Sequence, residues 1–281
     1  MKKVVLLVAL LLSSLTFQSQ IVTPQPSPKC ILNQMVGLTD VEVEYSRPGL
    51  KGRNIFGDLV PFGKVWRTGA NSNSTISFSE DVIIDGKTLK KGKYAIFTLP
   101  KVESWEIIFY SKTDNWGNPE VWNESDVAVR ATVVPQILNR NVENFTIDIN
   151  NLDNNFGYLN ISWEKTLVSL KFEVPTQKMA MASIDKIMAG PSSGDYFSAA
   201  QFYLQSNGDM TKALAYVNKA LELNKATPFW YTKLKSLIQA KLGDKKGAIE
   251  TAKISLAAAK EAKNNDYVKM NEDNIAEWSK K

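Results

Sequence analysis

The sequence predicts an α+β multidomain protein, in which an N-terminal all-β sandwich or jelly roll precedes a C-terminal α-helical domain of tetratricopeptide-like (TPR-like) repeats. Three observations lead to this prediction. Strand-like segments separated by turn residues continue from Val41 to Val174 without a helical pattern between them. From Met179 the spacing of apolar residues becomes helical. A Gly-Asp pair then recurs 35 residues apart, at Gly208 and Gly243, which is close to the TPR period of about 34 residues.

The first twenty residues predict export. Lys2 and Lys3 precede an uninterrupted apolar run from Val4 to Leu12, and small and polar residues follow. This is the order of a secretory signal peptide. The run is well short of the ~20 residues that span a bilayer. We therefore expect a signal peptide over 1–20, no integral membrane segment after its removal, and a periplasmic or secreted protein.

The composition excludes several kinds of chemistry. The chain has 281 residues, no histidine and a single cysteine. Catalysis by Ser-His-Asp or Cys-His groups is thereby excluded, as is an intrachain disulfide. The formal net charge is +5 without a dense basic run, so we do not expect nucleic-acid binding. The chain has no P-loop and no CxxC motif, and we predict neither a metal site nor a cofactor.

The β domain is expected over 30–175, after a proline-rich linker over 21–29. In the segment 143–152 the apolar residues Phe145, Ile147 and Ile149 share one face, so one face of that strand should be buried and the other wet. The expected strands cover 41–46, 75–78, 82–84, 93–99, 105–111, 127–137, 143–152 and 158–174.

Turn residues separate these strands. Asp85-Gly86 stands where a tight hairpin turn needs positive φ. Pro135, inside the segment 127–137, predicts a strand edge or a bulge. The run 148–155 resembles a calcium loop in composition but lacks the EF-hand spacing, so we interpret it as a solvated turn.

The helical part is expected to begin with a connecting helix over 176–191. TPR-like repeats over 192–281 follow, and Asp209 and Asp244 should cap the second helix of each repeat. The stretch 266–281 should form a helix that covers the open apolar end. The alternative is an unrelated helical bundle. Because the concave face of such helix pairs usually binds a peptide or protein, we expect a protein partner there.

Arginine, tryptophan and glycine gather in the stretch 45–75. Arginine offers a planar fork for carboxylates or phosphates, and tryptophan can stack on a sugar or another ring. Glycine lets the backbone turn sharply beside a ligand. The stretch therefore predicts a loop-built pocket for a small anionic or saccharide ligand. The expected binding residues are Arg47, Arg53, Trp66, Arg67 and Asn71, with Trp116 from a second loop.

A purely structural interpretation stays open for the same residues. Arg53 and Arg67 could form ion pairs that join loops, and Asn71 could cap a turn. Trp116 and Trp122 could seal the end of a sandwich. The acidic partners would then be Glu42, Glu44, Asp58 or Asp148.

The motifs "YSRP", "KGR", "VWRTGAN" and "GKYAIFTLP" occur in this order, and "WEIIFY" and Trp116-Gly117 follow them. Over about residues 29–175 the chain resembles the bacterial domain-of-unknown-function family 2911, common in exported proteins of the Bacteroidetes. Members often carry a short TPR-like tail, to which residues from 192 onward are similar. The resemblance implies export and a β domain, and it implies no reaction.

Three functions are consistent with these features. We favour a non-catalytic ligand- or partner-binding module at the cell envelope over an enzyme. The first alternative is a glycan-active hydrolase, which would need two carboxylates ~5 to 10 Å apart in a cleft. The second is a structural or assembly protein of the envelope.

Overall fold

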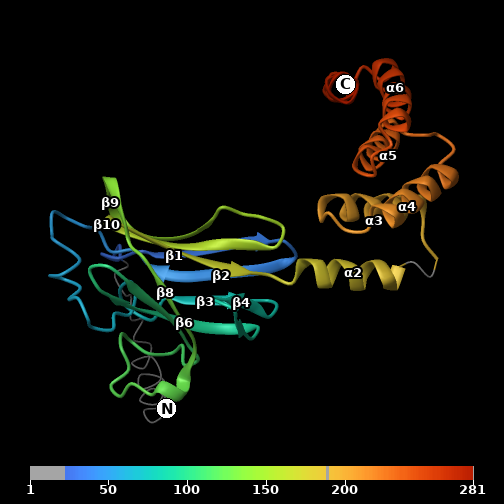
Figure 1. The fold of residues 1–281 in the computed structure, drawn as a ribbon. Helices are drawn as coiled ribbons and strands as arrows, with labels where there is room; N and C mark the ends of the chain where they lie inside the picture. Colours follow the sequence, from blue (N-terminus) through green and yellow to red (C-terminus); the bar gives the residue numbers. More distant parts are fainter. Residues whose placement is uncertain (1–22, 188–189, 281) are drawn as a thin grey trace, which may run out of the picture. The chain divides into compact units, whose positions relative to one another are not determined.

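The protein is described by a computed structural model that covers residues 23–187 and 190–280, so the expected signal peptide lies outside the described residues. The chain divides into a β unit, residues 23–36 and 40–173, and a helical unit, which comprises the chain from 174 together with Gly37–Thr39. A β region over 29–173 followed by helices from 176 to 278 confirms the predicted order (Figure 1).

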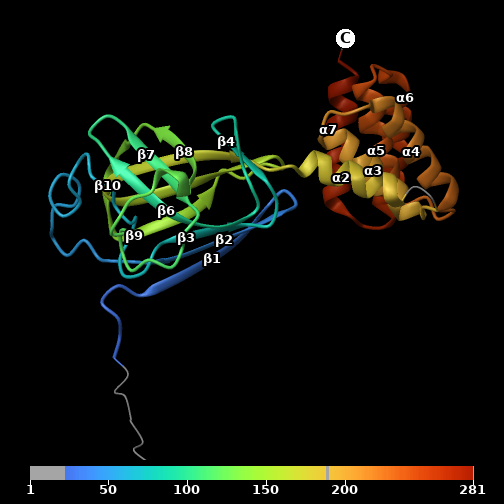
Figure 2. The ribbon, with the colours of Figure 1, turned by 90° about the horizontal axis from the view of Figure 1, so that it is seen from below.

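The described strands make two sheets (Figures 1 and 2). The first has the order β1-β2-β3-β6-β7-β8 and the second the order β5-β4-β10-β9. The strand pairs from β2 onward are antiparallel. The bounds are β1 Lys29–Val36, β2 Thr39–Ser46, β3 Thr75–Phe78, β4 Val82–Ile84, β5 Lys87–Leu89, β6 Gly92–Pro100, β7 Trp105–Tyr110, β8 Val127–Val133, β9 Gln136–Asn150 and β10 Phe156–Glu173.

Side chains from both sheets meet in one hydrophobic core. Phe78 of β3 lies edge-on against Phe172 of β10, with ring centroids 5.5 Å apart. Tyr45 of β2 donates a hydrogen bond from its hydroxyl to the carbonyl oxygen of Ile147 on β9 (2.9 Å). Burial raises the pKa of Tyr45 to about 12. The three apolar residues of the predicted buried face of β9 are at most 5% exposed, which confirms that prediction.

The single strand expected over 127–137 is wrong. β8 ends at Val133 and belongs to the first sheet, whereas β9 begins at Gln136 and belongs to the second. Pro135 lies between them, and because proline has no N–H to donate, it stops the ladder of the first sheet. The residue that was expected to mark an edge or bulge therefore marks the passage of the chain between sheets. A short 3₁₀ helix, η1 (Glu124–Asp126), precedes β8.

β9 and β10 are longer than the short strands that the sequence predicts, with 15 and 18 residues. They pair with each other from Tyr158 opposite Asn150 to Leu167 opposite Gln136. The register shifts on both sides of Glu164, which has a φ of 53°. Such a bulge bends a long hairpin and lets it follow the curvature of the core.

The helical unit contains the described helices α2 to α7, of which α2 begins directly after Pro175. The predicted caps are confirmed: the carboxylate of Asp209 accepts the backbone N–H of Lys212 (2.9 Å), and that of Asp244 accepts the N–H of Gly247 (2.8 Å). The bounds are α2 Thr176–Ile187, α3 Ser193–Gln205, α4 Met210–Leu223, α5 Phe229–Lys241, α6 Lys245–Glu261 and α7 Asn265–Trp278.

The helical unit has a hydrophobic core of its own. Ala200 and Tyr203 of α3 pack with Ala213 of α4 and Ile238 of α5 in one buried cluster. The alanines are fully buried, which lets neighbouring helices approach closely. Over the described residues, no helix has the length and apolar character needed to cross a membrane.

Candidate functional site

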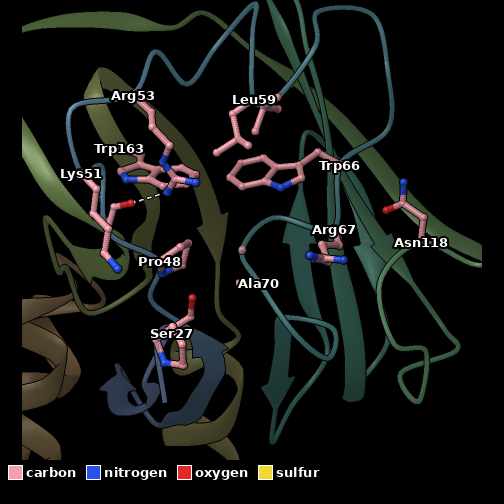
Figure 3. A pocket seen from close by; sticks show the side chains of 14 residues that line it. Ser27, Pro48, Lys51, Arg53, Leu59, Trp66, Arg67, Ala70, Asn118 and Trp163 are labelled. Atoms are coloured by element: carbon pink, nitrogen blue, oxygen red, sulfur yellow. Dashed lines mark hydrogen bonds between the residues drawn. The ribbon is translucent and has the colours of Figure 1, made fainter. Parts of the chain in front are cut away.

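A pocket of about 690 Å³ opens in the β unit (Figure 3). Most of its wall comes from the stretch between β2 and β3, the segment in which arginine, tryptophan and glycine gather. Fourteen residues line it: Pro26, Ser27, Pro48, Gly49, Lys51, Arg53, Leu59, Val60, Trp66, Arg67, Gly69, Ala70, Asn118 and Trp163.

Two indole rings provide the aromatic part of the wall. Trp66 and Trp163 lie nearly parallel, with an interplanar angle of 16° and ring centroids 6.0 Å apart. Phe145 contacts both rings edge-on, at 5.3 and 5.7 Å. The backbone of Trp66 exchanges hydrogen bonds with Thr98 on β6, N to O 2.7 Å and 2.9 Å. Trp66 is therefore fixed by the sheet through its backbone and by the core through its ring.

Among the described residues that line the pocket, three are cationic and none is Asp or Glu. Arg53 is anchored to its own loop: its Nε donates to the carbonyl of Leu50 (3.1 Å) and its Nη2 to that of Gly49 (2.6 Å), as Figure 3 shows for the latter. Lys51 and Arg53 lie on one side of the view in Figure 3 and Arg67 on the other, with the ring of Trp66 between them. The described lining residues therefore carry positive charge and no carboxylate; the carboxylate of Glu143, behind this wall, accepts the backbone N–H of Lys51 (3.0 Å).

Arg67 is half-buried, and its Nε is buried without a hydrogen-bond partner among the described residues. Gly117 makes room for this guanidinium. It has a φ of 95°, and a Cβ added to it would lie 2.9 Å from Nη1 of Arg67. An unpaired buried donor is costly to the folded state.

Hydrogen bonds join the second loop, 113–122, to the stretch that contains Arg67. The side chain of Asn73 donates to the carbonyl of Gly117 (2.9 Å) and accepts the N–H of Asn115 (3.1 Å). The amide of Asn118 donates to the carbonyl of Val65 (2.8 Å). The two loops that the sequence singles out are therefore joined around Arg67.

Three of the expected binding residues, Arg53, Trp66 and Arg67, line the pocket, and Arg47 does not. The Nε of Arg47 donates to the carbonyl of Phe145 (3.1 Å), and its Nη2 donates to the hydroxyl of Thr146 (2.8 Å). This arginine joins the end of β2 to β9.

Asn71 and Trp116 also lie outside the lining set. Asn71, with a φ of 61°, donates to the carbonyl of Ser27 (3.3 Å) and to the hydroxyl of Ser46 (3.2 Å), so it holds a wall residue in place. Trp116 is 78% exposed, next to the glycine that faces Arg67. Trp122 instead packs against Phe97 and Tyr110 at ring distances of 5.4 and 4.7 Å, so of the two loop tryptophans it is the one that covers a buried hydrophobic cluster of β6 and β7.

The expected alternative of ion pairs for the pocket arginines is wrong over the described residues. Neither Arg53 nor Arg67 is within ion-pairing distance of a described carboxylate. Two of the proposed acidic partners are engaged elsewhere. Glu44 pairs with Lys29 (2.7 Å), and Asp148 accepts hydrogen bonds from the amides of Asn150 and Asn160.

Sequence reasoning did not select Trp163, Lys51 or Asn118. Trp163 lies on β10, about a hundred residues from Trp66, and its alternating surroundings are typical of a core residue. It is 2% exposed, yet it lines the pocket. For Lys51 the only available signal is its place two residues before Arg53 in the same glycine-rich stretch.

Comparison with protein families gives a match over the β region. A family model described as "Protein of unknown function (DUF2911)" matches residues 27–172. No curated protein and no solved structure matches the chain. The family match covers more than half of the sequence and every residue that lines the pocket except Pro26. The chain therefore belongs to the DUF2911 family of proteins of unknown function.

Proposed function

We propose that the protein is an exported, non-catalytic binding module whose β unit holds a small anionic ligand in the pocket around Trp66. The observation that carries the proposal is the convergence of Lys51, Arg53 and Arg67 on a pocket whose lining includes no carboxylate.

Cations that face the same space repel one another unless counter-charge lies between them, and their interaction is stronger beside a low-dielectric wall than in bulk water. The rings of Trp66 and Trp163 provide such a wall. A ligand anion would relieve the repulsion and would accept hydrogen bonds from the guanidinium of Arg67, which has no carboxylate partner among the described residues.

Location and architecture belong to the same proposal. Export to the periplasm or beyond is inferred from the leader-like residues 1–20. We also propose that the β domain, 30–175, is a jelly-roll sandwich. The segment 176–191, which contains α2, would connect the two domains, and the helices over 192–281 would be a TPR-like array with a protein partner. The shared core of the two sheets and the Asp-capped helices support these assignments.

The alternatives have less support from this pocket. A carboxylate-based glycan hydrolase needs an acid and a second carboxylate beside the bound sugar, and the lining residues include neither. A purely structural role predicts arginines that are paired internally, which the described carboxylates do not provide for Arg53 or Arg67.

A thermal-shift experiment tests the proposal. The protein from residue 21 onward is heated with phosphate, sulfate or citrate, and the Arg67→Met variant is compared with the control Arg140→Met. Arg140 is an exposed arginine of β9 outside the pocket lining. A ligand at 100 times its Kd adds about 2.7 kcal/mol of stability. We expect anion-dependent shifts in wild type and Arg140→Met that are absent in Arg67→Met. Equal shifts in all three proteins would contradict the proposal.

A further inference from the structure

The aromatic wall of the pocket constrains the ligand beyond its charge. Trp66 and Trp163 are within 16° of parallel, and Phe145 contacts both. Their faces are therefore fixed before any ligand arrives. Aromatic rings of this kind bind flat apolar surfaces, and in a carbohydrate that surface is the C–H face of a sugar ring.

Polar groups surround this wall. Arg53 has two of its guanidinium nitrogens occupied by loop carbonyls, so the third, Nη1, is the one left for a ligand. Arg67 lies on the other side of Trp66 in Figure 3, and the side-chain nitrogen of Asn118 is already bonded to the carbonyl of Val65. A ligand that fills this space needs a flat ring face for the indole of Trp66. It also needs oxyanions on two sides of that ring, one for each guanidinium.

The form of the pocket favours a carbohydrate over other ringed anions. Its volume of about 690 Å³ is much larger than a single inorganic anion or a small aromatic acid needs. Lys51, Arg53, Leu59 and Asn118 are exposed, so the rim is open and a chain could continue out of it. Nucleotide phosphates are commonly held at helix N-termini, and the lining residues here all belong to the β unit.

From these observations the geometry points to an anionic carbohydrate as the ligand class, namely a sugar unit that bears a carboxylate or a sulfate. A sugar ring of this ligand stacks on Trp66, which Trp163 backs, and its oxyanions are bound by Arg53 on one side of that ring and by Arg67 on the other. The inference rests on the proposed function, because it names the ligand of the same pocket.

Isothermal titration of the full mature chain tests this assignment at fixed ionic strength. The carboxylate probe is a trimer of galacturonate, and the sulfate probe is a chondroitin sulfate disaccharide. Maltotriose is the neutral control, and inorganic phosphate and indole-3-acetate are the controls without a sugar. The variants are Arg67→Met, Arg53→Met and Trp66→Phe, with Arg140→Met as the matched arginine outside the pocket.

We expect the carboxylate or the sulfate probe to bind, and the probe that binds identifies the oxyanion. Arg67→Met and Arg53→Met should each weaken binding about tenfold or more, since each removes a charge-assisted hydrogen bond. Trp66→Phe should weaken the binding of the sugar probes without changing the binding of phosphate. Arg140→Met should bind every probe as wild type does. If the variants do not fold, the salt dependence of wild type provides the test. The affinity of wild type for the charged probe must fall as salt is added, because salt screens the attraction between the arginines and the oxyanions.

Three results would overturn the assignment. Binding of maltotriose as tightly as the charged probes would mean that charge is not recognised. Binding of phosphate or indole-3-acetate as tightly as the sugars would contradict the assignment of a carbohydrate ligand. The proposed anion-binding function would then still hold. Binding of no probe, together with no anion-dependent thermal shift, would overturn both proposals.

Discussion

At the scale of single residues, Gly117 controls the environment of Arg67. Its φ of 95° disfavours any side chain, and a Cβ there would lie 2.9 Å from Nη1 of the arginine. The loop that carries Gly117 is joined to the stretch of Arg67 through Asn73, so a methyl group on residue 117 would displace the flexible end of the Arg67 side chain. One glycine therefore links loop conformation to the proposed binding site.

Gly117→Ala should lower the free energy of unfolding by about 1 to 2 kcal/mol and should also weaken anion binding. Gly63→Ala is the matched control, because Gly63 has a φ of 72° with open space around it. Gly63→Ala should lower the free energy of unfolding through the same backbone strain, but it should bind the anion as wild type does. Urea unfolding and titration of both variants separate the two effects. Equal binding by the two variants would show that Gly117 does not position Arg67.

Lys233 of α5 is a buried cation in the helical unit. It is 7% exposed, and its ammonium donates to the carbonyl of Met270 (3.2 Å). Burial lowers its pKa, an effect that the charge of Asp273 opposes. The folded state therefore binds this proton less tightly than the unfolded state, and the charged form makes folding less favourable.

Lys233→Met should raise the free energy of unfolding at pH 7 by roughly 1 kcal/mol. The unfolded chain binds more protons between the lowered pKa and the ordinary value of about 10.5, so wild-type stability rises with pH through that window. The advantage of the variant should shrink there. Urea unfolding from pH 7 to 10.5 measures this, with Lys253→Met, an exposed lysine of α6, as the control. A pH-independent difference would rule out desolvation as the cause.

At the scale of elements, the two Gly-Asp sequences produce different turns. Gly243 itself adopts positive φ (86°) after α5, whereas after α3 the residue with positive φ is Asn207 (48°), not Gly208. The loop before α4 is one residue longer than the loop before α6. Only the aspartate has the same role in both, as the cap of the helix that follows.

Asp209→Ala and Asp244→Ala should each lower the free energy of unfolding of the helical unit by about 1 kcal/mol. Each exposes a backbone N–H at the start of a helix that the carboxylate now satisfies. Asn at either position should restore most of the stability, because its side-chain oxygen accepts the same bond. Circular dichroism during urea unfolding measures the change. An Asn variant as unstable as the Ala variant would show that charge, and not the cap hydrogen bond, is responsible.

Local features of the fold could be predicted, and features that depend on distant pairing could not. The buried face of β9 and the two aspartate caps follow from residues a few positions apart. Trp163 joins the pocket only because β10 lies against the core beside Trp66, and no local pattern encodes that register. For the same reason the sequence could not tell that Trp122 packs inward while Trp116 is 78% exposed.

At the scale of the whole molecule, each unit has its own core, and every residue that lines the pocket belongs to the β unit. The last lining residue along the chain is Trp163, well before the helical unit begins at 174. The fragment 23–175 should therefore fold and bind the charged sugar probe with the Kd of the full chain, within about twofold. Titration and near-ultraviolet circular dichroism of both proteins test this, and Arg67→Met in the fragment should abolish the binding as it does in the full chain. A folded fragment that binds tenfold more weakly would show that the helical unit contributes to the site. The proposal that the β unit alone binds the ligand would then be wrong.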